Sequence, residues 1–167
     1  MNLSDIGTSA CGRKVASCVR CHPARVKPVL VERHWLATVD PDGAPHVVPV
    51  GAFWDNGSFY FTSGPGTRKS KNLATNPECV MSVATDPFDI TVEGRADRVT
   101  DPDDLERIAA IARDRGGWPA RVENDAFTAE FSAPSAGPPP WYLYRMTAER
   151  VYAFGTAEPY GATRFSF

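Results

Sequence analysis

Residues 35–63, "WLATVDPDGAPHVVPVGAFWDNGSFYFTS", decide the fold of this chain. The segments "HWLATV" and "PHVVPVGAFW" (45–54) are rich in β-branched and aromatic residues, and "DPDG" between them favours a tight turn. Asn56-Gly57 follows, a pair that tolerates positive φ at both turn positions, so "SFYFTS" is expected to pair back as the next strand. This stretch therefore predicts consecutive antiparallel hairpins.

The remainder of the chain adds more strands and one long helix. "ECVMSVA" and "DITVEGRADRV" have the composition of strands, and "DPDDLERIAAIARDRG" has a capping Asp101, Pro102 in its first turn and Gly116 at its stop. "WYLYRMTAERVYAFG" (141–155) is interpreted as a final hairpin. Five to seven short antiparallel strands, with a short helix after the third, predict a mainly β fold, a small barrel with a few helices.

Composition limits the classes of function. The chain has 167 residues, which favours one domain, and 43% of them are hydrophobic. A net charge of −2 lacks the basic field of a general nucleic-acid or anionic-membrane binder. No apolar run approaches the roughly 18 residues of a membrane span, and the first residues lack the layout of a signal peptide. We expect a cytoplasmic protein without nucleic-acid or membrane partners.

Residues 1–28 are interpreted as an atypical or poorly ordered leader, which leaves 29–167 as the folded domain. The leader contains "CVRCH", which matches the C-x-x-C-H pattern of covalent haem attachment, and its cysteines with His22 could instead supply a zinc site. The pattern is short, and adjacent Cys21 and His22 make an awkward chelating pair. We interpret the motif as incidental and predict no metal site.

The stretch "TSGPGTRKSKNLATNP" (62–77) raises a different question, because it places Arg68, Lys69 and Lys71 at the start of the short helix. Cations are disfavoured there by the helix dipole, by roughly 0.3–1 kcal/mol each. A bound dianion would reverse that sign, and Thr67 is placed to cap the helix. Backbone N–H groups, a guanidinium fork and an ammonium together indicate a site for a phosphate-bearing ligand.

Two other interpretations of this cluster are weaker. "GPGTRKS" approaches a P-loop, but Arg68 stands where the motif requires glycine, and the surrounding strands are antiparallel. A solvated helix face is the commonest fate of a charge run, yet it leaves the position at a helix N-terminus unexplained. We therefore favour the phosphate site.

Taken together, these motifs resemble the pyridoxamine 5′-phosphate oxidase-like split β-barrel superfamily, especially its flavin and deazaflavin oxidoreductase branch. The likeness runs from about Trp35 to Phe167, and its most specific parts are "DPDGAPHVVPV" and the "FYFT…TRK…NL…NP" block. The ending "ATRFSF" is similar to the A-T-R-W-x-F ending of the branch that uses coenzyme F420, with Phe165 where tryptophan is usual.

The resemblance implies a homodimer with FMN or F420 held at each subunit boundary. Segments on two strands would contact the cofactor ring and chain, the short helix would bind the phosphate, and Arg164 would reach over from the tail. The residues implied are Val48, Pro49, Val50, Phe61, Thr62, Thr67, Arg68, Lys69, Asn72 and Arg164.

The function implied is an F420-dependent oxidoreductase that transfers hydride between reduced F420 and an unsaturated small molecule. The alternatives are an FMN-dependent oxidoreductase of the pyridoxamine 5′-phosphate oxidase type and a non-catalytic flavin- or haem-binding protein. A hydride carrier needs few protein acids or bases, so no catalytic residue is assigned. Tyr60, Tyr160 and His46 are the conceivable proton donors.

Overall fold

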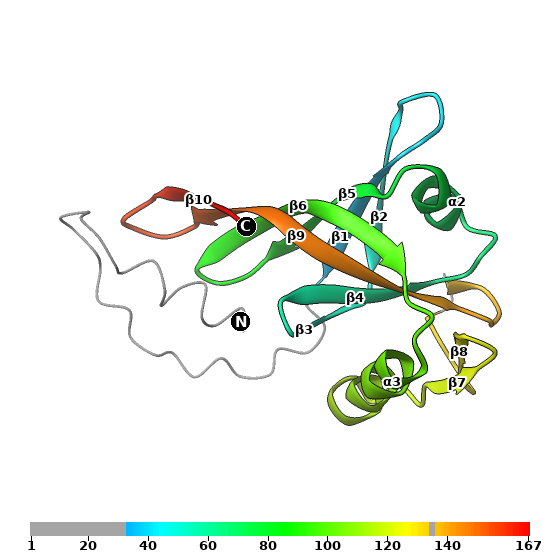
Figure 1. Cartoon of the computed structure of the whole chain (residues 1–167). Helices are drawn as coiled ribbons and strands as arrows, with labels where there is room; N and C mark the ends of the chain where they lie inside the picture. The colour runs from blue at the N-terminus through cyan, green and yellow to red at the C-terminus, as the bar shows by residue number, and fades with distance from the viewer. Residues whose placement is uncertain (1–32, 134–135) are drawn as a thin grey trace.

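The computed structural model describes residues 33–133 and 136–167. The expected leader, with its "CVRCH" stretch, lies outside the described residues. Within them, no helix is long and apolar enough to cross a membrane. The elements, labelled in Figure 1, are β1 (His34–Val39), β2 (Pro45–Val50), β3 (Ala52–Asp55), β4 (Ser58–Ser63), α2 (Arg68–Thr75), β5 (Glu78–Ala84), β6 (Phe88–Arg98), α3 (Pro102–Gly116), β7 (Arg121–Glu123), β8 (Ala126–Thr128), β9 (Tyr142–Gly155) and β10 (Ala162–Ser166).

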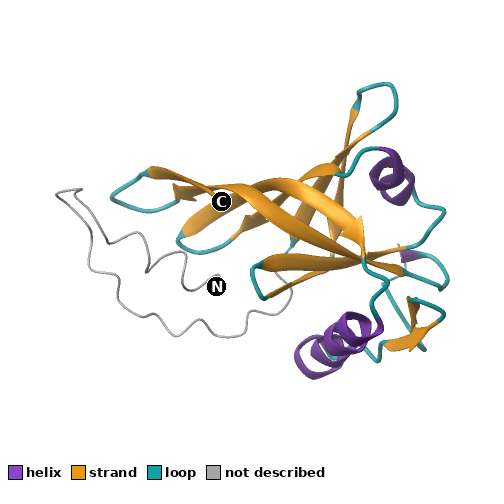
Figure 2. Ribbon diagram, viewed as in Figure 1, coloured by secondary structure: helices purple, strands orange, loops and turns teal. Residues whose placement is uncertain are grey.

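One antiparallel sheet dominates the structure. Its strands follow the order β2-β1-β5-β6-β9-β4-β3, with β10 paired to β9. The strands at the two ends of this order, β2 and β3, are separated in the chain by Gly51 alone. A sheet whose end strands are consecutive in the chain must curl back on itself, and Figure 2 shows its strands curving around a common interior. The predicted mainly β, antiparallel split barrel is confirmed.

Two apolar clusters lie on opposite faces of β4. Phe59 and Phe61 are fully buried in the inner cluster, inside the curled sheet, whereas Tyr60 belongs to the outer cluster beneath α3. Successive side chains of a strand point to opposite faces, which gives this division. Helix α3 contributes an apolar stripe at helical spacing to the outer cluster, and its four members are all buried: Leu105, Ile108, Ala109 and Ala112.

The ends of α3 follow the sequence signals closely. The Asp101 side chain accepts a hydrogen bond of 2.9 Å from the backbone N–H of Asp104, and Pro102 is the first helical residue. The helix continues through Gly116, and Gly117 adopts the left-handed conformation that ends it, with φ of 61°. The predicted stop at Gly116 is confirmed as the last helical residue, and Gly117 takes the C-terminal cap.

Three expectations from sequence are corrected. "PHVVPVGAFW" forms two strands, β2 and β3, because the chain crosses at Gly51 from one end of the sheet order to the other. "WYLYRMTAERVYAFG" is not a hairpin: residues 142–155 form the single strand β9, and the hairpin partner is β10 in the tail. Strand β9 lies between β6 and β4, so it is paired along both edges. The structure also has more strands than expected, including the small hairpin of β7 and β8.

Candidate functional site

The predicted phosphate site lies where β4 leads into α2. Strand β4 ends at Ser63, and Thr67 is the N-cap, with extended backbone and a side-chain oxygen that accepts from the N–H of Ser70 at 3.3 Å. The Thr67 hydroxyl also donates to the carbonyl oxygen of Gly64 at 3.0 Å and lies 2.7 Å from the Ser63 hydroxyl. The predicted cap is confirmed, and its hydroxyl is held by contacts within the loop.

Capping leaves part of the helix N-terminus without a partner. The N–H of Ser70 reaches Thr67, and that of Lys71 bonds to the Thr67 carbonyl at 3.1 Å. The backbone N–H groups of Arg68 and Lys69 have no acceptor among the residues that the structure describes. Such groups, at the positive end of a helix, are suited to an anion.

Arg68 and Asn72 converge on Asp40, a residue that sequence reasoning treated only as part of a turn. The Nε of Arg68 donates to Oδ1 of Asp40 at 2.8 Å, and its Nη2 forms an ion pair with Oδ2. The Nδ2 of Asn72 donates to the same Oδ1 at 2.8 Å and to Thr38 Oγ1 at 3.1 Å. This network joins α2 to the turn between β1 and β2, and a turn signal alone could not have revealed it.

Lys69 has different surroundings. Its side chain is partly buried, and desolvation lowers the pKa of its ammonium below the usual value of 10.5. No carboxylate of the described ranges forms an ion pair with it. A cation that is desolvated without a counter-ion is costly, so an anion bound beside Lys69 would be strongly favoured.

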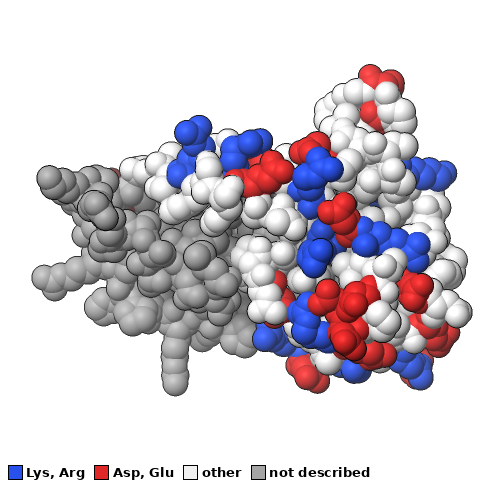
Figure 3. Space-filling view, viewed as in Figure 1, with Lys and Arg blue, Asp and Glu red and all other residues white. Residues whose placement is uncertain are grey.

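The net positive charge of this cluster suits a phosphate-bearing anion. Arg68, Lys69 and Lys71 carry three positive charges and Asp40 one negative charge, which leaves a formal charge of +2. A phosphate monoester at neutral pH carries about −1.5 to −2. On the face in Figure 3, acidic side chains gather over α3. The whole chain has a net charge of −2, so the positive cluster at α2 is a local feature.

The strand residues expected to contact the cofactor lie on different faces. Val48 and Val50 face inward, where Val50 packs against the inner cluster, whereas Pro49 lies on the outer face opposite Trp35. Phe61 is buried and its ring stacks on that of Tyr144, with the ring centroids 5.4 Å apart. Thr62, the next residue of the strand, points to the opposite face. The side chains of Val48 and Val50 share one face of β2 and that of Pro49 lies on the other, so the expectation that all three contact the cofactor ring stays a prediction.

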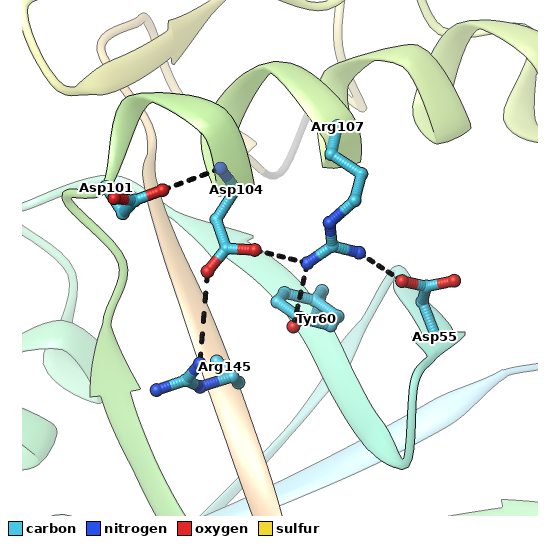
Figure 4. Close-up of polar contacts among 6 residues, drawn as sticks. All are labelled: Asp55, Tyr60, Asp101, Asp104, Arg107 and Arg145. Carbon is cyan, nitrogen blue, oxygen red and sulfur yellow. Dashed lines mark hydrogen bonds and ion pairs between the residues drawn. The ribbon is translucent and has the colours of Figure 1, made fainter. Parts of the chain in front are cut away.

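The conceivable proton donors are scattered. The Tyr60 hydroxyl accepts from Nη2 of Arg107 at 3.2 Å beneath α3, within the polar cluster of Figure 4 that also includes Asp55, Asp104 and Arg145. Tyr160 is 72% exposed in the turn before β10. His46 is half-buried on β2, opposite Thr38.

Arg164 lies on β10, exposed and opposite Tyr152 of β9. Figure 1 shows β10 and α2 at opposite ends of the sheet. Within one chain, the structure therefore brings together Thr67, Arg68, Lys69 and Asn72 but leaves Arg164 remote from them. No three metal-binding side chains gather within 33–133 and 136–167.

Comparisons with known proteins bear on the family and the fold of the chain. The sequence profile of the family described as pyridoxamine 5′-phosphate oxidase matches residues 31–155. A pyridoxine/pyridoxamine 5′-phosphate oxidase of Ectopseudomonas mendocina (strain ymp) is 30% identical, over 74% of this chain. The match spans 66% of that relative, just under two thirds of its length.

Solved structures show similar folds. A structure described as an F420 reductase is 25% identical, with a TM-score of 0.52, over 72% of this chain and 88% of that one. A pyridoxamine 5′-phosphate oxidase-related, FMN binding protein from Nostoc punctiforme PCC 73102 is 17% identical, with a TM-score of 0.55, over 81% and 87%. At that identity the second likeness concerns the fold alone.

Proposed function

Because the chain belongs to the pyridoxamine 5′-phosphate oxidase family, we propose that it is an oxidoreductase that uses reduced coenzyme F420 to reduce an unsaturated small molecule. The observation that carries this proposal is the N-terminus of α2. There Lys69 is partly buried without a carboxylate partner, and two backbone N–H groups have no acceptor among the described residues. Both features favour an anion such as the phosphate of a flavin-type cofactor.

The residues at this position fit a phosphate. Lys69 would supply an ammonium, Arg68 a guanidinium edge, and the first turn of α2 its N–H groups. Thr67 would stabilise that turn by accepting a hydrogen bond from the N–H of Ser70. Its hydroxyl proton is already donated to the Gly64 carbonyl, so Thr67 would not donate to the phosphate. Phe61 would support the site from the core, while Thr62 and the β2 segment Val48, Pro49 and Val50 would lie nearer the ring.

The chemistry itself belongs to the cofactor. When bound, reduced F420 supplies a hydride, and solvent or a side chain supplies the proton that completes reduction of a double bond. The task of this chain is then to fix the phosphate and to hold ring and substrate in contact. We assign no catalytic residue, since a hydride carrier needs few protein acids or bases and the hydroxyl of Tyr60 is engaged by Arg107.

The choice of F420 rests on the ending "ATRFSF" and on the 25% identity to the F420 reductase. FMN is the second candidate, supported by the 30% identity to the oxidases. The same cluster at α2 would serve either phosphate, so the two cofactors differ mainly in what the rest of the molecule contacts. A cytoplasmic location stays a prediction.

We also propose that the chain acts as a homodimer. Arg164 lies on β10, which Figure 1 shows far from α2 of the same chain, so we propose that it contacts a cofactor at α2 of a second copy. The outer face of β1 and β2 is apolar and open: Trp35 is 45% exposed and Val47 is 55% exposed. A second copy would cover these side chains.

A fluorescence titration of the cofactor-free protein with FMN and with F420, repeated on Arg68→Ala, tests the proposal. We expect tighter binding of F420 than of FMN, and loss of affinity in the variant. The reverse preference would replace the reductase with an FMN-dependent enzyme. If neither compound binds to the wild-type chain, the phosphate site is wrong.

A further inference from the structure

Asp40 is a buried carboxylate at the edge of the proposed phosphate site. Its side chain is 6% exposed, and its backbone N–H bonds to the Ala44 carbonyl at 2.9 Å, which closes the turn between β1 and β2. Arg68 and Asn72 reach it from positions 28 and 32 residues further along the chain. A buried carboxylate that receives donors from another element fixes those donors in place.

The contact uses only one edge of the Arg68 guanidinium. Nε and Nη2 face Asp40, whereas Nη1 has no hydrogen-bond partner among the described residues, and the side chain is 60% exposed. A planar guanidinium has five N–H donors, so one edge can hold a carboxylate while the other faces a phosphate. Asp40 therefore does not remove Arg68 from the site but sets the plane in which it lies.

Asn72 has no such spare donor. Both contacts of its Nδ2 are made within the chain, to Asp40 and to Thr38, so its two N–H groups are in use. The remaining polar atom of the side chain is Oδ1, which can only accept a hydrogen bond, and an ionised phosphate oxygen has no proton to donate to it. Although Asn72 was expected to contact the cofactor, its geometry instead supports Asp40.

We propose that Asp40 is the positioning residue of the phosphate site: it orients Arg68 toward the cofactor phosphate, and Asn72 holds Asp40 in place. This inference rests on the proposed function. We therefore expect that Asp40→Asn weakens phosphate binding, which is the opposite of what the change in charge alone predicts. Asp40→Asn raises the formal charge of the cluster from +2 to +3, which by Coulomb attraction would tighten phosphate binding. Loss of orientation weakens it.

The experiment compares each cofactor with its phosphate-free counterpart. Dissociation constants are measured by fluorescence for FMN and riboflavin, or for F420 and its phosphate-free chromophore, on the wild type and on Asp40→Asn. We define the phosphate-dependent ratio of affinities as the dissociation constant of the phosphate-free compound divided by that of the phosphate-bearing one. We expect this ratio to fall about tenfold in the variant, with riboflavin affinity unchanged. Asp42→Asn is the matched control: it makes the same charge change in the same turn, and among the described residues the Asp42 carboxylate accepts a hydrogen bond only from the N–H of Ala44.

Two further variants separate the outcomes. In an Arg68→Ala background, Asp40→Asn should have no further effect on the ratio, because Asp40 acts through Arg68. Should Asp40→Asn not fold, Arg68→Lys tests the same point, since an ammonium keeps the charge but cannot present two edges, and it should lower the ratio similarly.

Three results would overturn the inference: an unchanged or increased ratio in Asp40→Asn, an equal loss for both ligands, or an additive effect in the Arg68→Ala background. The proposed function fails separately, when the wild type itself binds the phosphate-bearing and phosphate-free compounds equally or not at all.

Discussion

Three neighbouring cations at the start of α2 have three different surroundings. Arg68 is paired with Asp40, Lys69 is partly buried without a carboxylate partner within the described ranges, and Lys71 is exposed. Sequence could place all three at a helix N-terminus, and it identified Thr67 as the cap, because these are local signals. It could not find Asp40, since a turn fully accounts for an aspartate in "DPDG" and the contact with Arg68 is not local.

Lys69→Met tests the unpaired ammonium. We expect binding of the phosphate-bearing cofactor to weaken about 10- to 100-fold, since a charge-assisted hydrogen bond contributes about 1.5–3 kcal/mol. Lys71→Met, on the exposed side of the helix, is the control and should change the affinity less than about threefold. Equal effects of the two substitutions would mean that general charge, rather than Lys69, attracts the ligand.

The same substitution has a stability signature with a definite dependence on pH. Burial lowers the folded-state pKa of Lys69 below 10.5, so between the two values the unfolded chain binds more protons at this residue and the free energy of unfolding rises with pH. Without cofactor, Lys69→Met should therefore melt slightly above the wild type at neutral pH, and the difference should vanish as pH approaches 10.5. Thermal melts across pH measure this, and a lower midpoint at neutral pH contradicts it.

At the scale of elements, strand composition and turn signals were enough to predict an antiparallel sheet, but not its pairing. The order in which β9 joins β6 to β4 depends on long-range packing that alternation along one strand does not encode. Gly51 illustrates the limit. It lies inside a continuous β-rich segment, yet the chain there leaves β2 and enters β3 at the other end of the sheet order.

A bulge at Gly94 is the element-scale feature most sensitive to substitution. The register of β6 and β9 shifts between Glu93 and Gly94, and a Cβ at Gly94 would lie 2.0 Å from the carbonyl oxygen of Thr147. Gly94→Ala must push two central strands apart, so we expect a loss of about 3 kcal/mol or more, or failure to fold. Gly51→Ala, where a Cβ meets open space, should stay within about 1 kcal/mol. Denaturant unfolding compares them, and similar midpoints would refute the bulge assignment.

The polar cluster of Figure 4 links α3 to strands β3 and β4 of the sheet. Arg107 forms ion pairs with Asp104 on its own helix and with Asp55 on β3, and it donates to Tyr60. Arg107→Ala removes the donor to Asp55 and Tyr60, while Asp104 keeps its ion pair with Arg145, so the free energy of unfolding should fall by about 1–3 kcal/mol. Arg95→Ala, which breaks an exposed pair with Glu78, should cost less than about 1 kcal/mol.

Cofactor affinity supplies the second readout for Arg107. The cluster lies beneath α3, on the face of β4 opposite the inner cluster, so Arg107→Ala should leave the phosphate-dependent ratio of affinities unchanged. A selective loss of phosphate binding would place α3 in the site.

At the scale of the whole molecule, the expected cofactor contacts lie in two separate regions of the chain. One region carries α2 and the phosphate cluster, and the other carries β10 with Arg164. A single chain therefore holds only part of the expected cofactor site. Sequence reasoning anticipated a partner for Arg164 through a family resemblance alone, because no residue pattern within one chain encodes a contact between two copies.

Val47→Glu tests the proposed dimer. Val47 lies on the outer face of β2, on the side of the sheet that carries Trp35, and a charge buried against a second copy is unfavourable by several kcal/mol. We expect the wild type to sediment as a dimer and the variant as a folded monomer with weakened cofactor binding. Phe131→Glu, which also places a carboxylate on an exposed apolar residue (60% exposed), is the control. A wild type that sediments as a monomer with full cofactor affinity contradicts the arrangement.

The central claim, that the N-terminus of α2 binds the phosphate of a flavin-type cofactor, is tested most directly by a crystal structure of the chain grown with FMN or F420. We expect phosphate density against the backbone N–H groups of Arg68 and Lys69, with the Lys69 ammonium in contact and Arg68 still paired with Asp40. Bound cofactor with its phosphate elsewhere on the molecule would contradict the claim.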